Sequence, residues 1–155
     1  MPHIHEKIDF TVEVFIVHKN KVLLRKHDKY KIWLSVGGHV ELNEDPNEAA
    51  VREVKEEVGL DVTLADGLRP AGNDANGYKE LIPPKFLNRH TISSNHEHVS
   101  LIYFAAAPTD SIENEGREKS DECKWFTEEE LNDPSYALRE SVKLYAKTAL
   151  KELAS

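Results

Sequence analysis

The chain has 155 residues, which favours a single domain over residues 1–155 with a sizeable hydrophobic core. A formal net charge of −8 argues against binding of DNA or RNA polymers through the overall field, and the single cysteine, Cys123, excludes an intrachain disulfide. No signal peptide or membrane-spanning apolar stretch is visible, so we expect no membrane association and a cytoplasmic location.

The N-terminal third predicts a β-hairpin followed by a short strand. Residues 10–18 are rich in β-branched and aromatic side chains, and a turn at Asn20 leads into a second strand at 21–26. The next apolar strand, within 31–41, is expected to be interrupted by two adjacent glycines. These strands lead directly into the clearest helix of the chain.

Residues 44–60 predict this helix from both of its ends. Asp45 is expected to cap the N-terminus, with Pro46 as the first helical residue. Glu48 lies three positions after Asp45 and completes a capping box. Gly59 supplies the C-terminal stop.

The rest of the chain predicts more strands, a long loop and two closing helices. The expected strands are 61–65, 98–107 and 123–127, and the expected helices are 128–131 and 136–154. Residues 66–97 are interpreted as a long polar loop, which in a compact domain is usually functional or disordered. The order of elements predicts an α/β or α+β fold in which a sheet lies between helices.

Three glutamates, Glu53, Glu56 and Glu57, share an arc of about 100° on the predicted helix. Like-charged neighbours cost roughly 0.2–0.5 kcal/mol per pair, and the helix dipole also disfavours carboxylates near the C-terminus. The buried stripe is expected from other positions, Val51, Val54 and Val58. The separate acidic face is either a solvated surface or a site where divalent cations bridge carboxylates and substrate phosphates, for which Mg²⁺ is suited.

The register around the helix favours the metal-binding interpretation. The segment "GHVELNEDPNEAAVREVKEEVGL" (38–60) matches every specified position of GX5EX7REUXEEXGU, in which U is aliphatic. The chain therefore resembles the Nudix hydrolase family (MutT-like), and "HEHVSLIYFA" and "CKWFTEEEL" extend the resemblance loosely to about Leu131. This resemblance implies a Nudix-type α/β/α sandwich with a mixed β-sheet.

The resemblance also implies a reaction and a set of ligands. Members of the family typically hydrolyse a nucleoside diphosphate linked to another moiety, with Mg²⁺ or Mn²⁺ as cofactor. Carried over by position, the metal ligands are the Gly38 carbonyl, Glu53, Glu56 and Glu57. Glu44 and Arg52 are then expected to hold the ligands in orientation, with direct phosphate contact as the alternative for Arg52.

A carboxylate must also accept a proton from the attacking water. Glu53 is the first choice for this catalytic base and Glu57 the second. The candidates outside the motif are Glu97, Glu118 and Glu122, each of which is also typical of a surface carboxylate.

Substrate selection is expected to depend on the predicted loop 66–97. The side chains there that could stack on a base or meet phosphates are Tyr78, Phe86, Arg89 and His90. His96 and His98 form an i,i+2 pair that should face one side of a strand, as metal or phosphate ligands or as ordinary packing residues. The expected partner is a small nucleotide-type substrate, and a homodimer is compatible with the sequence.

Two other functions were weighed against hydrolysis. A non-catalytic regulatory domain that binds a nucleotide would not need all the glutamates of the motif. Isomerisation of an isoprenyl diphosphate, found in one branch of this fold, relies on a cysteine early in the chain, whereas Cys123 is late.

Overall fold

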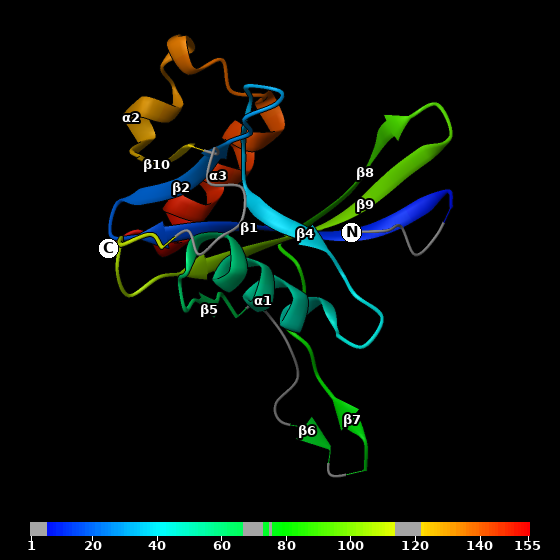
Figure 1. The fold of residues 1–155 in the computed structure, drawn as a ribbon. Helices are drawn as coiled ribbons and strands as arrows, with labels where there is room; N and C mark the ends of the chain where they lie inside the picture. Colours follow the sequence, from blue (N-terminus) through cyan, green and yellow to red (C-terminus); the bar gives the residue numbers. More distant parts are fainter. Residues whose placement is uncertain (1–5, 67–72, 75, 114–121) are drawn as a thin grey trace.

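The computed structural model describes residues 6–66, 73–74, 76–113 and 122–155 (Figure 1). Within these ranges, the main sheet contains β1 (Ile8–His18), β2 (Lys21–Lys26), β3 (Trp33–Leu34), β4 (Val36–His39), β5 (Thr63–Leu64), β8 (Phe86–Ser93), β9 (His96–Ala106) and β10 (Glu122–Phe126). A separate pair is formed by β6 (Asn73–Asp74) and β7 (Tyr78–Lys79). The helices are α1 (Pro46–Val58), α2 (Glu128–Leu131) and α3 (Glu140–Leu153), with a 3₁₀ turn at Pro134–Tyr136.

The central strand of the main sheet is β1. It pairs in parallel with β9 from Ile8–Glu97 to Val17–Ala106, and in antiparallel fashion with β2 and β4. The main path through the sheet is β10–β2–β1–β9–β5, while β3, β4 and β8 pair with β2, β1 and β9. The sheet is therefore mixed, as expected.

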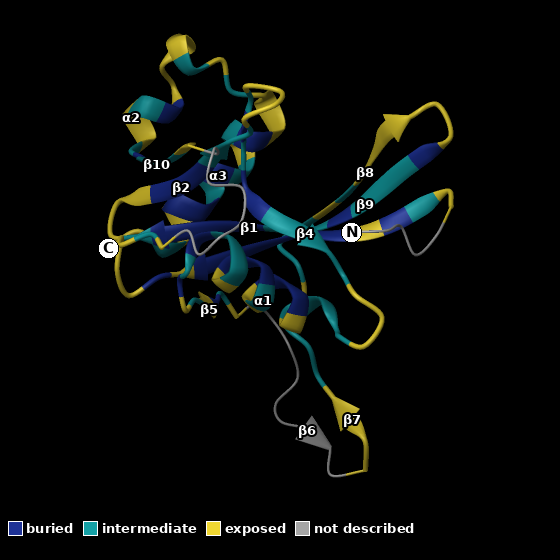
Figure 2. Ribbon diagram, in the orientation of Figure 1, coloured by how far each residue is buried: buried dark blue, intermediate teal, exposed yellow. Residues whose placement is uncertain are grey.

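Alternate residues of β1 point to the two faces of the sheet, and each face has its own core. Val12, Val14 and Ile16 pack with the alanines and valines of α1. Phe15 and Val17 pack on the opposite face with α3. Figure 2 shows both helices turning buried surface toward the sheet. The predicted α/β/α sandwich is confirmed.

Both ends of α1 form as predicted. The Glu48 backbone N–H donates to Asp45 Oδ1 at 2.8 Å, and the Asp45 backbone N–H donates to Glu48 Oε1 at 3.0 Å. Gly59 ends the helix in the left-handed region with φ of 71°, where glycine meets no steric penalty.

The prediction of a loop over 66–97 was wrong, because this range contains β8 and the first residues of β9. In the part of the chain that the structure describes, β8 pairs along one side only, with β9, and most of its residues are exposed. An exposed strand of this kind carries polar residues such as Asn88 and Thr91, so it lacks the apolar pattern by which strands are recognised.

Three smaller expectations also need correction. The two glycines lie inside β4, where they pair with β1, and do not interrupt a strand. Val51 is 40% exposed, whereas Val54 and Val58 are fully buried. The last helix begins at Glu140, because the preceding residues form the 3₁₀ turn and Ala137 is left-handed. Among the described residues, no helix has the length and apolar character needed to cross a membrane.

Candidate active site

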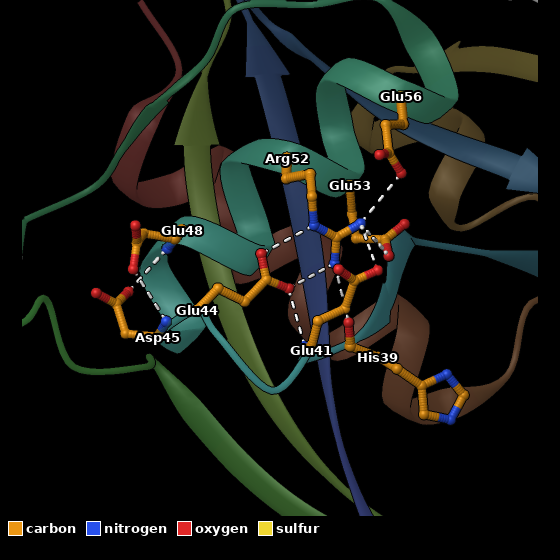
Figure 3. Close-up of polar contacts among 8 residues, drawn as sticks. All are labelled: His39, Glu41, Glu44, Asp45, Glu48, Arg52, Glu53 and Glu56. Atoms are coloured by element: carbon orange, nitrogen blue, oxygen red, sulfur yellow. Dashed lines mark hydrogen bonds and ion pairs between the residues drawn. The ribbon is translucent and has the colours of Figure 1, made fainter. Parts of the chain in front are cut away.

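Arg52 lies at the centre of a polar network on α1 (Figure 3). Its Nε donates to Glu44 Oε2 at 2.9 Å and its Nη2 donates to Glu44 Oε1 at 2.6 Å. The same Nη2 donates to the His39 carbonyl oxygen at 3.1 Å. The hydrogen bonds between Arg52 and Glu44 lower the pKa of Glu44 and raise that of Arg52, so the pair is ionised. This two-point contact fixes the plane of the guanidinium group.

The remaining guanidinium nitrogen contacts two of the predicted metal ligands. Arg52 Nη1 donates to Glu53 Oε1 at 2.9 Å and to Glu56 Oε2 at 3.1 Å. The positively charged Arg52 side chain therefore holds together two carboxylates that would otherwise repel each other. The contacts support the orienting role expected for Arg52. Through Arg52, the carboxylates on α1 are linked to Glu44 and to the His39 carbonyl at the end of β4.

The acidic face is not a solvated surface. Glu53 is only 9% exposed, and Ala49 and Ala50 beside it are fully buried. These alanines pack in the core against the sheet. The acidic face and the core face of α1 are therefore contiguous, and the carboxylates lie at their shared border.

Glu57 is buried to nearly the same degree as Glu53, with side-chain exposures of 13% and 11%. Arg25 Nη2 lies 3.4 Å from Glu57 Oε2, and the Gly37 backbone N–H donates to the same carboxylate. Burial raises the pKa of Glu57 to about 8; Arg25 opposes this shift and the neighbouring Glu53 charge adds to it. Burial also raises the pKa of Glu53. Without a cation, the two carboxyl groups therefore favour sharing a proton.

Arg25 was not identified from the sequence, although a signal was present. It follows the core residue Leu23 by two positions in β2, so both side chains point to the α1 face. A charged residue at an inward-facing strand position is unusual unless it is paired, and its partner here is Glu57.

The paired glycines allow β4 to approach both its neighbouring strand and the acidic helix. A Cβ at Gly38 would lie 2.5 Å from the Glu53 carboxyl carbon. A Cβ at Gly37 would overlap the Val12 carbonyl oxygen. Any side chain at position 38 would therefore occupy the space that the Glu53 carboxylate now fills.

These groups fit a hard divalent cation. The donors gathered on α1 are all carboxylate oxygens, which Mg²⁺ and Mn²⁺ prefer. Glu57 Oε2 is buried and accepts no hydrogen bond from the described part of the chain. A cation beside Glu53 and Glu57 would compensate the buried charge that otherwise raises the pKa of both groups.

Two of the predicted bases outside the motif, Glu97 and Glu122, lie on strands away from α1. Glu97 is the second residue of β9 and forms an ion pair with Arg89, Oε2 to Nε at 3.1 Å. Glu122 is exposed at the start of β10 and pairs in register with Lys26. Glu118 lies outside the described residues. Glu53 and Glu57 are the two candidates that the described structure brings together.

Three of the residues expected to bind substrate are not gathered at one place. Tyr78 hydrogen bonds to Glu80 beside the β6–β7 hairpin, which Figure 1 shows well away from β8. Arg89 and His90 are neighbours on β8, so they point to opposite faces of the sheet. His90 faces His98, with ring centroids 5.7 Å apart.

A cavity of about 380 Å³ adjoins the Arg52 network through His39 and Glu41. Its apolar lining comes from Phe10, Val40, Leu42 and Leu101, and its polar lining includes Asp9 and Glu41. No local sequence pattern predicts this cavity, because its walls come from β1, β9 and the segment between β4 and α1. Its volume lies in the range of small-molecule sites.

Comparison with known proteins agrees with this architecture. The model of the NUDIX domain family matches residues 8–147. A NUDIX-family hydrolase from Clostridium perfringens is 38% identical, with a TM-score of 0.81 over 93% of this chain and 97% of that chain.

Two more distant structures share the fold. A MutT NUDIX hydrolase from Burkholderia pseudomallei is 21% identical, with a TM-score of 0.61 over 96% of this chain and 100% of that chain. The dihydroneopterin triphosphate pyrophosphohydrolase of E. coli is also 21% identical, with a TM-score of 0.64 over 93% and 96%.

A mixed sheet between helices, with a carboxylate-bearing helix beside paired glycines, defines a class of hydrolases that act on diphosphate bonds. The chain belongs to the Nudix family within that class. Nudix hydrolases act on small nucleotide-type substrates and generally use divalent metal ions.

Proposed function

We propose that the chain is a Mg²⁺-dependent pyrophosphohydrolase that cleaves a diphosphate linkage in a nucleotide or nucleotide derivative. The observation that carries this proposal is the convergence of Glu53, Glu56 and Glu57 beside Gly38, braced by Arg52. Burying Glu53 against Glu57 is electrostatically unfavourable. A cation bound between the two carboxylates would compensate their repulsion.

The Gly38 carbonyl and the three glutamates would hold the cation. When bound, Mg²⁺ neutralises phosphate oxygens and lowers the pKa of a coordinated water. Arg52 and Glu44 keep the carboxylates in position, because the guanidinium contacts Glu53 and Glu56 while Glu44 fixes its plane. In this arrangement Arg52 is already saturated by protein contacts, which disfavours a direct role in phosphate binding.

Glu53 is the preferred base for the attacking water. Glu57 contacts Arg25 and the Gly37 backbone N–H, so its position suits charge balance and ligand placement. Burial raises the pKa of Glu53 above its ordinary range, which brings it closer to that of a group able to accept and return a proton near neutral pH. Glu57 is the second candidate.

The organic part of the substrate would bind in the cavity beside His39 and Glu41. Phe10, Leu42 and Leu101 provide apolar surface that suits the faces of a nucleobase. Glu41 provides an acceptor for N–H groups on the base edge, at the rim nearest to Arg52.

The test is a turnover screen with Mg²⁺ over nucleoside triphosphates, sugar nucleotides, ADP-ribose and dinucleoside polyphosphates. We expect hydrolysis of at least one compound, and loss of most activity in Glu53→Gln and Glu57→Gln with circular dichroism unchanged. The matched control is Glu129→Gln, on the exposed side of α2. Tight nucleotide binding without turnover across the panel would instead indicate a regulatory binding domain.

A further inference from the structure

A second group of metal-binding side chains lies on the sheet face away from α1. It consists of Asp9 on β1, His39 on β4, and His96 and His98 on β9, and we call it the imidazole cluster. Strand registers explain this convergence, because Asp9 pairs with His98 and Thr11 pairs with His39. Asp9 and His96 are buried, at 1% and 8% exposure.

The distances bring three ligand atoms of the imidazole cluster, one each from Asp9, His39 and His98, close enough to share one ion. Asp9 Oδ2 lies 3.4 Å from His39 Nε2 and 3.2 Å from His96 Nε2. Ligand atoms of Asp9, His39 and His98 all lie within 4.8 Å of one another. A tetrahedral zinc site with bonds of about 2.0–2.1 Å has ligand atoms roughly 3.4 Å apart. The two contacts of Asp9 are close to this edge length.

The contacts of His96 hold the Asp9 carboxylate in position. His96 Nδ1 lies 2.9 Å from the Glu6 carbonyl oxygen, which can only accept a hydrogen bond, so Nδ1 donates. The other ring nitrogen, Nε2, lies 3.2 Å from Asp9 Oδ2. His96 therefore links Asp9 to the backbone just before β1. Residues that orient a ligating carboxylate in this way are typical of metal sites.

We propose that the imidazole cluster binds one first-row transition metal ion of the zinc class, at a site separate from the carboxylates of α1. Two imidazoles and one carboxylate, those of His39, His98 and Asp9, suit Zn²⁺ and disfavour Mg²⁺, which prefers oxygen ligands. His96 then orients Asp9.

The two sites are adjacent in the chain but face opposite ways. Gly38 faces Glu53 of α1, and the next residue, His39, points through the other face of the sheet toward Asp9. A metal in the imidazole cluster would therefore join β1, β4 and β9 directly behind the strand that carries Gly38. We expect the metal to stabilise this end of the sheet, where β8, β9 and the start of β1 extend beyond α3 (Figure 1).

The test uses untagged full-length protein stripped with a chelator and titrated with Zn²⁺ or Co²⁺ alone. We expect one equivalent to bind in the presence of excess Mg²⁺, with a tetrahedral Co²⁺ absorption band and a raised Tm. His96→Gln and His98→Ala should each weaken Zn²⁺ binding at least about tenfold and abolish the Co²⁺ band. Asp9→Asn is a third variant, should either histidine variant fail to fold.

The controls separate the two metal sites. His27→Gln, which follows β2 outside the cluster, should bind Zn²⁺ as the parent does. Glu57→Gln should also retain Zn²⁺ while losing hydrolysis, so the two proposals fail independently. The proposal is overturned if folded His96→Gln and Asp9→Asn bind Zn²⁺ normally, if Glu57→Gln removes the binding, or if no Zn²⁺ binds at micromolar concentration. In these cases Asp9 and His96 form a buried ion pair.

Discussion

Arg52 and Glu44 form a two-point contact in which Nε and Nη2 meet the two carboxylate oxygens at 2.9 and 2.6 Å. This contact aims Nη1 at Glu53 and Glu56. The positions of two proposed metal ligands therefore depend on a pair that itself need not touch the metal.

Arg52→Lys should impair catalysis although it keeps the charge. An ammonium group cannot make the planar set of contacts to Glu44, Glu53 and His39 at once. We expect the Mg²⁺ concentration for half-maximal activity to rise about 10- to 100-fold, measured by Mg²⁺ titration of the initial rate. Arg139→Lys, at an exposed position before α3, is the control. An unchanged Mg²⁺ requirement in Arg52→Lys would show that catalysis does not depend on the two-point contact between Arg52 and Glu44.

The two adjacent glycines should fail in different ways when each is replaced by alanine. In Gly38→Ala the new methyl group displaces the end of the flexible Glu53 side chain, so the fold should survive while kcat falls by about 100-fold. In Gly37→Ala the methyl group meets backbone of β1, and the free energy of unfolding should fall by about 1–3 kcal/mol or more. Thermal melts and kcat on both variants separate the effects. Equal behaviour of the two would contradict the geometry.

The metal-free protein should lose stability as pH rises. Glu57 has its pKa raised from an ordinary value of 4.5 to about 8 in the folded chain, so the folded state binds this proton more tightly than the unfolded state. The contribution is complete below pH about 4.5 and is lost as pH rises through about 8. Urea unfolding with a chelator should show this fall, and added Mg²⁺ at pH 8 should restore stability. In Glu57→Gln the free energy of unfolding should change less with pH. If the free energy of unfolding of the parent protein is equally independent of pH, Glu57 is not a buried acid with a raised pKa.

Phe10→Ala should weaken substrate binding more than it slows chemistry. Phe10 lines the cavity beside His39, while its side chain makes no part of the Arg52 network. We expect KM to rise roughly tenfold, on the order of 1.4 kcal/mol of binding energy, with kcat nearly unchanged. Leu144→Ala, which also shortens an exposed apolar side chain, is the matched control on α3. A fall in kcat at constant KM would indicate that the organic group of the substrate does not bind in this cavity.

The sequence predicted those parts of the fold that depend on local rules. The capping box of Asp45 and Glu48, the stop at Gly59 and the hairpin of β1 and β2 all have short-range causes, so they were predicted correctly. The exposed strand β8 was missed because its stability comes from pairing with β9, which leaves little trace in its own residue pattern.

The candidate site shows the same division. The motif identified Glu44, Arg52 and the three glutamates through their spacing along the chain. Arg25 and Asp9 escaped notice because they come from other strands, and only the sheet register brings them to Glu57 and His39. The alternation of polar and apolar residues in "IDFTVEV" did carry a signal for Asp9, since it predicts one polar face on β1.

The parallel pairing of β1 with β9 also has a consequence for biosynthesis. Thr11 and Ser100, whose hydroxyl groups meet at 2.7 Å across these strands, are separated by 89 residues. The ribosome therefore releases β1 well before β9, its long parallel partner. Until β9 is made, the backbone edge of β1 that will pair with it is open to pairing with other chains. We therefore expect this chain to depend on chaperones or slow collapse more than a domain of equal size that is built from hairpins.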